Sequence, residues 1–223
     1  MLHLAALKNI PFCEQNKEAA RATNYGITEI LTRACTEFSV RLIFFSTDYV
    51  FGKYDRYWQE EDSPCPTTQY GIDKAASERL IQERLSDYAI VRTAQVYGFN
   101  GDFVSLVARA LTAHQKFTAF ANLANCPTWI GDLLPMVQKI IDDGRQGIFH
   151  CVGSEAMSRY QFAYEIANAL RLDTASIQAV NLDFSTDIRP PIVRLNGAST
   201  YEMLQVYPRK VKENLPLCTP YIR

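Results

Sequence analysis

The sequence predicts an α/β protein built on a parallel sheet. The segment MLHLAA at residues 1–6 is short and apolar, as is typical of a buried strand, and VRLIFF at 40–45 has the same character. Between them, residues 17–38 carry apolar side chains at helical spacing. A strand, a helix and a second strand in this order form a β-α-β crossover, which joins strands that run in the same direction.

The alternation of helix and strand continues along the chain. A polar, proline-containing loop at 52–68 precedes a helix expected from about Tyr70 to Leu85, and the strand YAIVRT follows at 88–93. The residues after Asn181 hold five of the ten prolines, so we expect loops and short helices there. The remaining expected elements are the helices FVSLVARALTAH, DLLPMVQKIIDD and SRYQFAYEIANALRL, the last opened by Ser158, and the strand GIFHCVG.

Composition excludes several classes of function. The chain has 223 residues, of which 48% are hydrophobic, so it can fill a core. Its 23 basic and 24 acidic residues give a net charge of −1 without a basic block, which argues against a nucleic-acid partner. No apolar run reaches the length of about 18 residues that crosses a bilayer, so we expect a cytoplasmic protein without membrane contact. Six scattered cysteines without a C-x-x-C pair or clustered histidines predict packed thiols and no metal site.

Polar residues end the second predicted strand, where STDYVFG occupies residues 46–52. Ser46, Thr47 and Asp48 are residue types that begin turns, which is one reading of this stretch. The other reading is that their side chains line a ligand site, because open α/β sheets bind ligands at the carboxyl ends of parallel strands. The two histidines within predicted strands, His3 and His150, are expected in the core and receive no functional role.

The segment QYGIDK at 69–74 supplies a candidate acid. Tyr70 and Lys74 are four residues apart and share one face of the predicted helix. A phenol has a pKa of about 10, and an adjacent ammonium group stabilises its anion, so the pair can act as a tuned proton donor. Thr47 could donate a hydrogen bond to the carbonyl that receives the proton. A Tyr-x-x-x-Lys pair alone is weak support, because it occurs by chance on many amphipathic helices.

Taken together, these motifs resemble a known family. The run from HLAA through STDYVFG to YWQEEDSPCPTTQYGIDKAASERL is similar to extended short-chain dehydrogenases/reductases, most closely to the dTDP-4-dehydrorhamnose reductases. The downstream stretches VRTAQVYG, NCPTWIGDLL, GIFHCVGSEAMSRYQFA and DIRPPIVRLN follow the same pattern, so the resemblance covers nearly the whole chain. It implies a Rossmann-like parallel sheet with a smaller C-terminal α/β substrate-binding part. Residues 1–95 would form the partial dinucleotide-binding domain, and 96–223 mainly the substrate-binding part, with some segments returning to the sheet.

The resemblance also implies a role for each matching residue. Tyr70 would donate the proton, Lys74 would bind the nicotinamide ribose and lower the pKa of Tyr70, and Thr47 would orient the sugar carbonyl. Asn24 matches a position that often holds water or backbone at the site. The implied cofactor is NADPH or NADH, and the implied substrate is a nucleotide-linked 4-keto sugar. The implied site residues are catalytic Tyr70, Lys74 and Thr47; cofactor-binding Ala5, Ala6, Leu7, Ser46, Tyr70 and Lys74; and substrate-binding Thr47, Asp48, Gln95 and Arg189.

The chain departs from the family pattern in several places. It contains no G-x-x-G-x-x-G turn, so we expect that about 60 residues, or two β-α units, of an N-terminal phosphate-binding segment would precede Met1. Gln95 stands where the family has an aromatic residue that packs on the deoxysugar, and it would present an amide instead. Asp73 adjoins Lys74 and could weaken the effect of that lysine on Tyr70 if its carboxylate folds back.

Several functions are compatible with the resemblance. The first is the reduction of a nucleotide-linked 4-keto sugar, with self-association through helices at 17–38 and 70–85. A second is a regulatory binding subunit, because the methionine adenosyltransferase beta subunit resembles the same reductases. An epimerase or dehydratase is a third, although a dehydratase would carry an Asp-Glu pair where this chain has Asp48 and Tyr49. The last is an inactive fragment.

Overall fold

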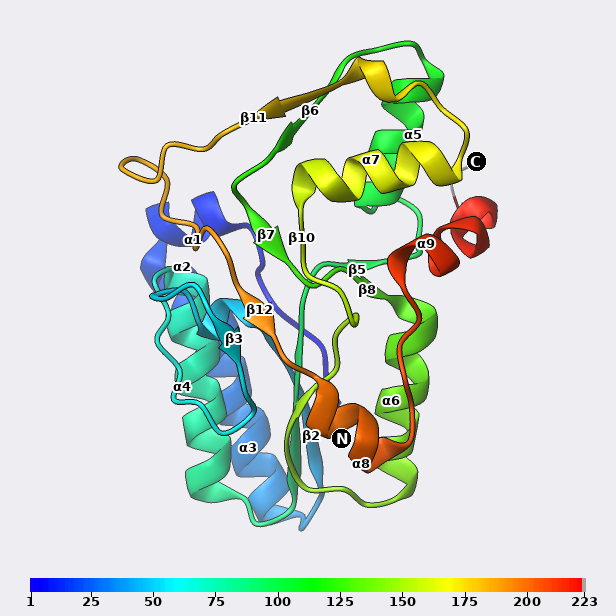
Figure 1. Cartoon of the computed structure of the whole chain (residues 1–223). Coiled ribbons are helices and arrows are strands. Elements are labelled where there is room, and N and C mark those ends of the chain that lie inside the picture. Colours follow the sequence, from blue (N-terminus) through cyan, green and yellow to red (C-terminus); the bar gives the residue numbers. More distant parts are fainter. Residues whose placement is uncertain (222–223) are drawn as a thin grey trace.

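The computed structural model describes residues 1–221, which are organised around a four-stranded parallel sheet (Figure 1). The strand order across the sheet is β1, β2, β4, β9, and each pair of neighbours is parallel. The predicted α/β fold class with a parallel sheet is thereby confirmed. The strands are β1 Leu2–His3, β2 Leu42–Thr47, β4 Tyr88–Thr93 and β9 Gly147–His150.

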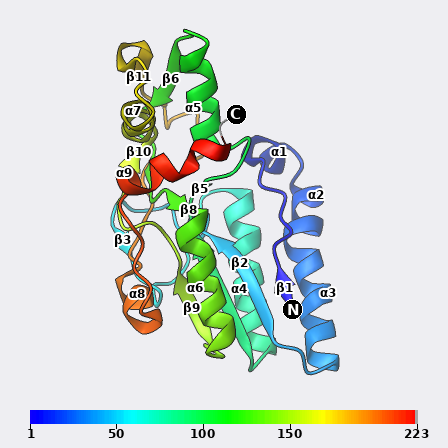
Figure 2. The ribbon, with the colours of Figure 1, turned by 90° about the vertical axis from the view of Figure 1, so that its right-hand side faces the viewer.

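Helices cover both faces of this sheet because its strands alternate their side chains between the two faces. Leu42 and Phe44 of β2 pack toward α3 and α4, whereas Ile43 faces α6 and α8. Figure 2 shows the two helical layers on opposite sides of the strands. The helices are α3 Ile27–Glu37, α4 Gln69–Arg84, α6 Ile130–Asp142 and α8 Ala198–Leu204.

A second hydrophobic core lies beyond the carboxyl ends of the main strands, at the top of Figure 1. It is formed chiefly by α5, α7, α9 and the parallel pair β6 and β11. The remaining short strands form three pairs, β5 with β8, β7 with β10 and β3 with β12. The bounds are α5 Phe103–Thr112, α7 Arg159–Ala169, α9 Val211–Asn214, β6 Phe117–Phe120, β11 Ile177–Val180, β5 Val96–Tyr97, β8 Thr128–Trp129, β7 Ala124–Asn125, β10 Met157–Ser158, β3 Tyr57–Trp58 and β12 Arg194–Leu195.

Chain segments from both halves of the sequence build the main sheet. Residues 96–223 contribute β9 as well as α6 and α8, which pack on one face. The boundary at residue 95, between a cofactor part and a substrate part, stays a prediction.

The N-terminal strand differs from the expectation. Instead of a buried strand over residues 1–6, β1 comprises only Leu2–His3, and within it only His3 is buried. The physical reason is its position: among the described residues β1 pairs with β2 alone, so it forms an edge of the sheet. Residues 4–9 continue as irregular backbone toward α1, Ile10–Gln15, a short helix that the sequence analysis did not predict.

The helix expected over residues 17–38 has three parts. It begins as α2, Lys17–Arg21, widens into a π-helical turn at Ala22–Gly26 and continues as α3. Turns of this kind occur mostly as isolated turns inside α-helices, often at functional sites. The buried residue of this turn is Asn24, whose side chain contacts Leu7.

The other predicted elements are found with small shifts at their ends. Ser158 caps α7 through a capping box, in which its hydroxyl accepts from the Gln161 N–H at 3.0 Å and the Gln161 side chain accepts from the Ser158 N–H at 2.8 Å. His3 and His150 are buried core residues, as expected. Within residues 1–221, no helix combines the length and the apolar composition needed to span a membrane.

Candidate active site

The carboxyl end of β2 forms one wall of the candidate site. Thr47 is its last residue, and the Thr47 hydroxyl accepts a hydrogen bond from the Tyr49 N–H at 3.2 Å, capping the 3-10 turn Asp48–Val50. The same hydroxyl donates to Asp48 Oδ1 at 2.9 Å. STDYVFG therefore does begin a turn, and this turn fixes the Thr47 hydroxyl beside α4.

The first turn of α4 brings Tyr70 to this wall. Thr68 caps the helix by accepting from the Gly71 N–H at 3.1 Å. A Cβ atom at Gly71 would lie 2.1 Å from the Tyr49 carbonyl oxygen, so only glycine allows this approach between α4 and the 3-10 turn. Tyr70 consequently packs edge-on against Tyr49, with ring centroids 6.0 Å apart, and its phenol lies near enough to the Thr47 hydroxyl for Thr47 to lower its pKa.

Lys74 lies one turn further along α4, and its side chain is buried. Its ammonium group donates to the Phe45 carbonyl oxygen at 2.5 Å and sits 3.8 Å from the centre of the Phe44 ring. Burial lowers the pKa of Lys74 to about 7, while the Glu78 carboxylate acts in the opposite direction.

The expected lowering of the Tyr70 pKa by Lys74 stays a prediction. Burial raises the pKa of Tyr70, the nearby Thr47 hydroxyl lowers it in part, and Lys74 is not among the groups that act on it. The reason is geometric, because the Lys74 ammonium is turned down against β2. Asp73 does not fold back on Lys74 either; its carboxylate accepts from Gln69 at 2.9 Å and faces Arg21 at 3.4 Å.

Asp48 occupies a second, acidic side of the site. It is buried, and burial raises the pKa of its carboxyl to about 6. The Asn125 amide donates to Asp48 Oδ2 at 3.3 Å, and the positive charge of Arg159 also favours the ionised form. These three side chains line one small cavity.

Asn125 and Arg159 received no role in the sequence analysis, although both lie in stretches that carry the family resemblance. Asn125 ends β7 and Arg159 begins α7, so folding brings them to Asp48 from distant parts of the chain. Arg159 has no carboxylate within ion-pair distance among the described residues. The only sequence signal for a role of Asn125 and Arg159 was their position at the ends of predicted elements, and this signal is weak.

The backbone expected to approach the cofactor is held by Asn24. In the π-helical turn, the Asn24 side chain accepts from the Leu7 N–H at 2.7 Å and donates to the Leu7 carbonyl at 3.1 Å. Ala5 and Ala6 precede this clamp and are exposed. The assignment of both residues to the cofactor stays a prediction. Ser46, at the end of β2, is buried with its hydroxyl unpaired.

Gln95 lies just beyond β4, whose last residue, Thr93, is paired with Thr47. Its backbone has a φ of 36°, in the left-handed region that non-glycine residues rarely adopt. Both polar atoms of its amide are buried without a hydrogen-bond partner. Gln95 therefore lies near the carboxyl ends of β2 and β4, and its contact with a substrate stays a prediction.

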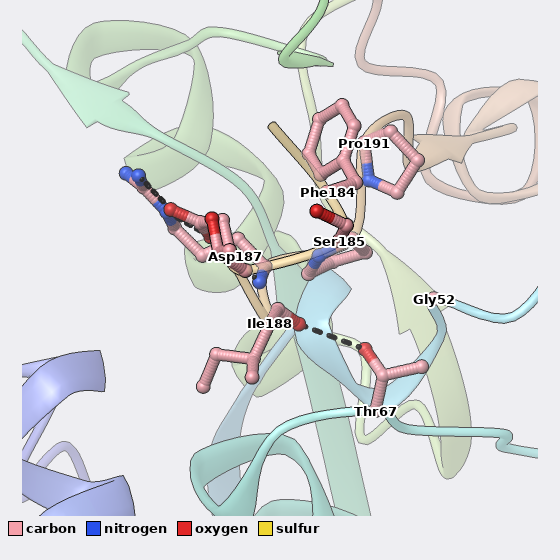
Figure 3. A pocket seen from close by; sticks show the side chains of 10 residues that line it. Gly52, Thr67, Phe184, Ser185, Asp187, Ile188 and Pro191 are labelled. Atoms are coloured by element: carbon pink, nitrogen blue, oxygen red, sulfur yellow. Dashed lines mark hydrogen bonds and ion pairs between the residues drawn. The ribbon is translucent and has the colours of Figure 1, made fainter. Parts of the chain in front are cut away.

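Arg189 belongs to a loop that lines a separate pocket of about 340 Å³ (Figure 3). Its guanidinium donates to both oxygens of Asp187, at 2.9 and 2.5 Å, and this carboxylate raises the pKa of Arg189. Thr67 ties the loop to the region after β3 by donating to the Ile188 carbonyl at 3.5 Å. Arg189 is therefore paired with Asp187 in this structure, while its charge also acts on Tyr49, the neighbour of Tyr70.

Comparison with known proteins places these features in a family context. The profile of the family described as RmlD substrate binding domain matches residues 1–221. A dTDP-4-dehydrorhamnose reductase of Mycolicibacterium smegmatis is 31% identical over 188 residues, which cover 82% of this chain and 58% of that protein. The methionine adenosyltransferase 2 subunit beta of Rattus norvegicus is 26% identical over 193 residues, covering 81% of this chain and 57% of that one.

Solved structures agree on the fold. The crystal structure of a dTDP-4-dehydrorhamnose reductase from Bacillus anthracis in complex with NADP superimposes with a TM-score of 0.89 at 23% identity, covering 98% of this chain and 78% of that one. The chain spans about three fifths of the length of the curated relatives that it matches. The family resemblance on which the sequence analysis relied is confirmed.

Proposed function

The chain belongs to the RmlD substrate-binding domain family, and from this premise we propose that it serves the NAD(P)H-dependent reduction of a nucleotide-linked 4-keto sugar. The observation that supports the proposal most is the contact between the Thr47 hydroxyl and the Tyr70 phenol at the carboxyl end of β2. A hydroxyl and a phenol that meet at this place can both hydrogen-bond one carbonyl oxygen.

In the proposed reaction, Tyr70 supplies the proton. As the sugar carbonyl is reduced, its oxygen gains negative charge and takes the phenol proton, which leaves an alcohol and a tyrosinate. Thr47 holds that oxygen by donating a hydrogen bond, and to do so it must release Asp48 Oδ1. Lys74, one turn further along α4, would favour the tyrosinate by its positive charge once ligand binding brings its ammonium from β2 toward Tyr70. A nicotinamide cofactor, when bound, supplies the hydride that goes to C4.

The residues present fit the nicotinamide end of such a cofactor. Ala5 and Ala6 offer exposed backbone with small side chains, and Ser46 offers an unpaired hydroxyl. Lys74 and Tyr70 would hold the ribose. The choice between NADPH and NADH belongs to the proposal, as do the substrate contacts of Asp48, Gln95 and Arg189, the homodimer and the cytoplasmic location.

A non-catalytic binding role, as in the methionine adenosyltransferase beta relative, is the second candidate. The observation that favours it is the raised pKa of Tyr70, on which Lys74 has no effect in this structure. A phenol in that state is a poor acid unless ligand binding brings the ammonium closer.

Replacing Tyr70 by phenylalanine separates the two candidates. For a reductase, Tyr70→Phe should lower kcat by about 100-fold or more, because general acid catalysis contributes about 100- to 10,000-fold. Turnover would be followed by the loss of NADPH absorbance with a dTDP-4-keto-6-deoxy sugar, and cofactor affinity by calorimetry.

Tyr49→Phe is the matched control, since it removes the neighbouring phenol on the 3-10 turn. It should retain most of the turnover. Equal activity of Tyr70→Phe and the unaltered protein would remove Tyr70 from the acid role. Ligand binding without turnover in the unaltered protein would support the second candidate.

A further inference from the structure

A buried ionic cluster lies behind the candidate site and has no part in the reaction proposed above. Glu78 of α4 and Arg92 of β4 form an ion pair of 2.8 Å, and their side chains are each 1% exposed. Arg92 also donates to the Glu60 carbonyl at 3.1 Å and lies 3.3 Å from Nε2 of His150, on β9. The cluster therefore joins α4 to two strands of the sheet.

Lys74 lies one helical turn from Glu78, at the spacing that places two side chains on the same face. Among the described residues no carboxylate comes within ion-pair distance of Lys74, so Glu78 acts on it across space. The other groups that face the ammonium are His3 on β1, and Phe44 and the Phe45 carbonyl on β2. Asp73, the neighbouring carboxylate in sequence, faces Arg21 instead.

A buried ammonium without an opposite charge nearby tends to lose its proton. Neither histidine adds positive charge near neutral pH, because burial lowers the pKa of His3 to about 4 and that of His150 to about 3. Glu78 is therefore the group that can keep Lys74 charged. Arg92 in turn fixes the orientation of the Glu78 carboxylate, because its Nε and Nη2 donate to the two carboxylate oxygens at 3.1 and 2.8 Å.

We propose that Glu78 is a positioning residue for Lys74: its carboxylate, locked in place by Arg92, keeps the buried Lys74 ammonium charged where it donates to the Phe45 carbonyl. The functional meaning of this arrangement rests on the role proposed above for Lys74. The charge relation itself is independent of that role, because it concerns only the buried groups of α4 and β4.

The direct test is the titration of Lys74 by nuclear magnetic resonance in protein with isotope-labelled lysines. The Lys74 signal is the one that Lys74→Arg removes. Glu78→Gln should lower the titration midpoint of Lys74 by one pH unit or more. At pH 7 the charged fraction would then fall from about half to about a tenth or less. Glu78→Asp, which keeps the charge, should restore most of the difference.

Asp73→Asn is the matched control, because it removes a buried carboxylate next to Lys74 that faces Arg21. It should leave the Lys74 midpoint where it is. An unchanged midpoint in Glu78→Gln, or an equal shift in Asp73→Asn, would overturn the proposal. If Glu78 had only a structural role, Glu78→Gln would lower the free energy of unfolding without changing the titration midpoint of Lys74.

Glu78→Gln leaves Arg92 buried without its counter-ion, which can prevent folding. If circular dichroism shows an unfolded variant, Glu78→Gln combined with Arg92→Gln removes the pair together, and the midpoint should again be lower. An unchanged midpoint in the folded double variant would also overturn the proposal. The titration of Lys74 does not depend on whether the protein reduces a sugar. A failure of the proposed function would instead appear as absent turnover, so the two failures can be distinguished.

Discussion

The side chain of Asn24 is expected to stabilise the N-terminal part of the fold by clamping Leu7. Asn24→Ala removes the two hydrogen bonds to the Leu7 backbone, at 2.7 and 3.1 Å. The backbone carbonyl of Asn24, which accepts from Thr28 and Ser77, is unaffected by this change. At about 1–2 kcal/mol for each partly buried group left without a partner, the loss in the free energy of unfolding should be about 2–4 kcal/mol.

Urea unfolding followed by tryptophan fluorescence measures this loss, since Trp58 is buried in the native state. With a slope of about 2–3 kcal/mol per M, the midpoint should fall by about 1 M. Asn9→Ala is the control, because it removes a single exposed cap bond of 3.0 Å to Phe12 and should cost about 0.5–1 kcal/mol. If Asn24→Ala costs no more than Asn9→Ala, the clamp does not hold the segment.

Three further predictions concern α4, Asp48 and self-association. Gly71→Ala should destabilise the protein by more than about 3 kcal/mol in urea unfolding, because the added Cβ meets the Tyr49 carbonyl; a loss under about 1 kcal/mol would contradict the close approach. The pKa of Asp48 rises from 3.8 to about 6 on folding, so the folded protein retains a proton that the unfolded chain releases, and stability falls as pH rises through this window. Asp48→Asn should therefore gain about 2.5 kcal/mol relative to the unaltered protein between pH 4 and pH 7.5, and an equal difference at both pH values would refute this. The groove of about 660 Å³ between α3 and α4 is the predicted dimer face. Light scattering should show a dimer of the unaltered protein at micromolar concentration, and Leu80→Asp should convert it to a monomer. A monomeric unaltered protein would contradict this prediction.

Periodicity predicted most of the fold because the buried faces of the strands and helices are long enough to leave a pattern. The strand YAIVRT at 88–93 and the helix capped by Ser158 are found as expected. The helix α1 was missed because it has only six residues and carries a proline in its first turn, so it leaves no apolar period. The N-terminal segment was predicted as buried because its composition says nothing about whether a strand lies at an edge.

The site was predictable only where one stretch of sequence carries it. Thr47 and Tyr70 come from motifs whose spacing suggests their chemistry, and the structure brings them together. Asn125 and Arg159 reach Asp48 from separate elements, so no local pattern announces them. The pKa values of Lys74 and Tyr70 depend on how deeply each side chain is buried, and the sequence does not show this burial.

The π-helical turn at Ala22–Gly26 limits how this region can be engineered. A π-helical turn accommodates one residue more than the α-helical turn it replaces, and each residue rotates the following helix by about 100°. Deleting a residue here would give a regular helix, but it would also turn the buried face of α3, with Thr28, Thr32 and Cys35, away from the sheet. The additional residue thus sets the rotation of α3 relative to Asn24. A deletion meant to give a regular helix would therefore lose either the contact of Asn24 with Leu7 or the packing of α3 on β2.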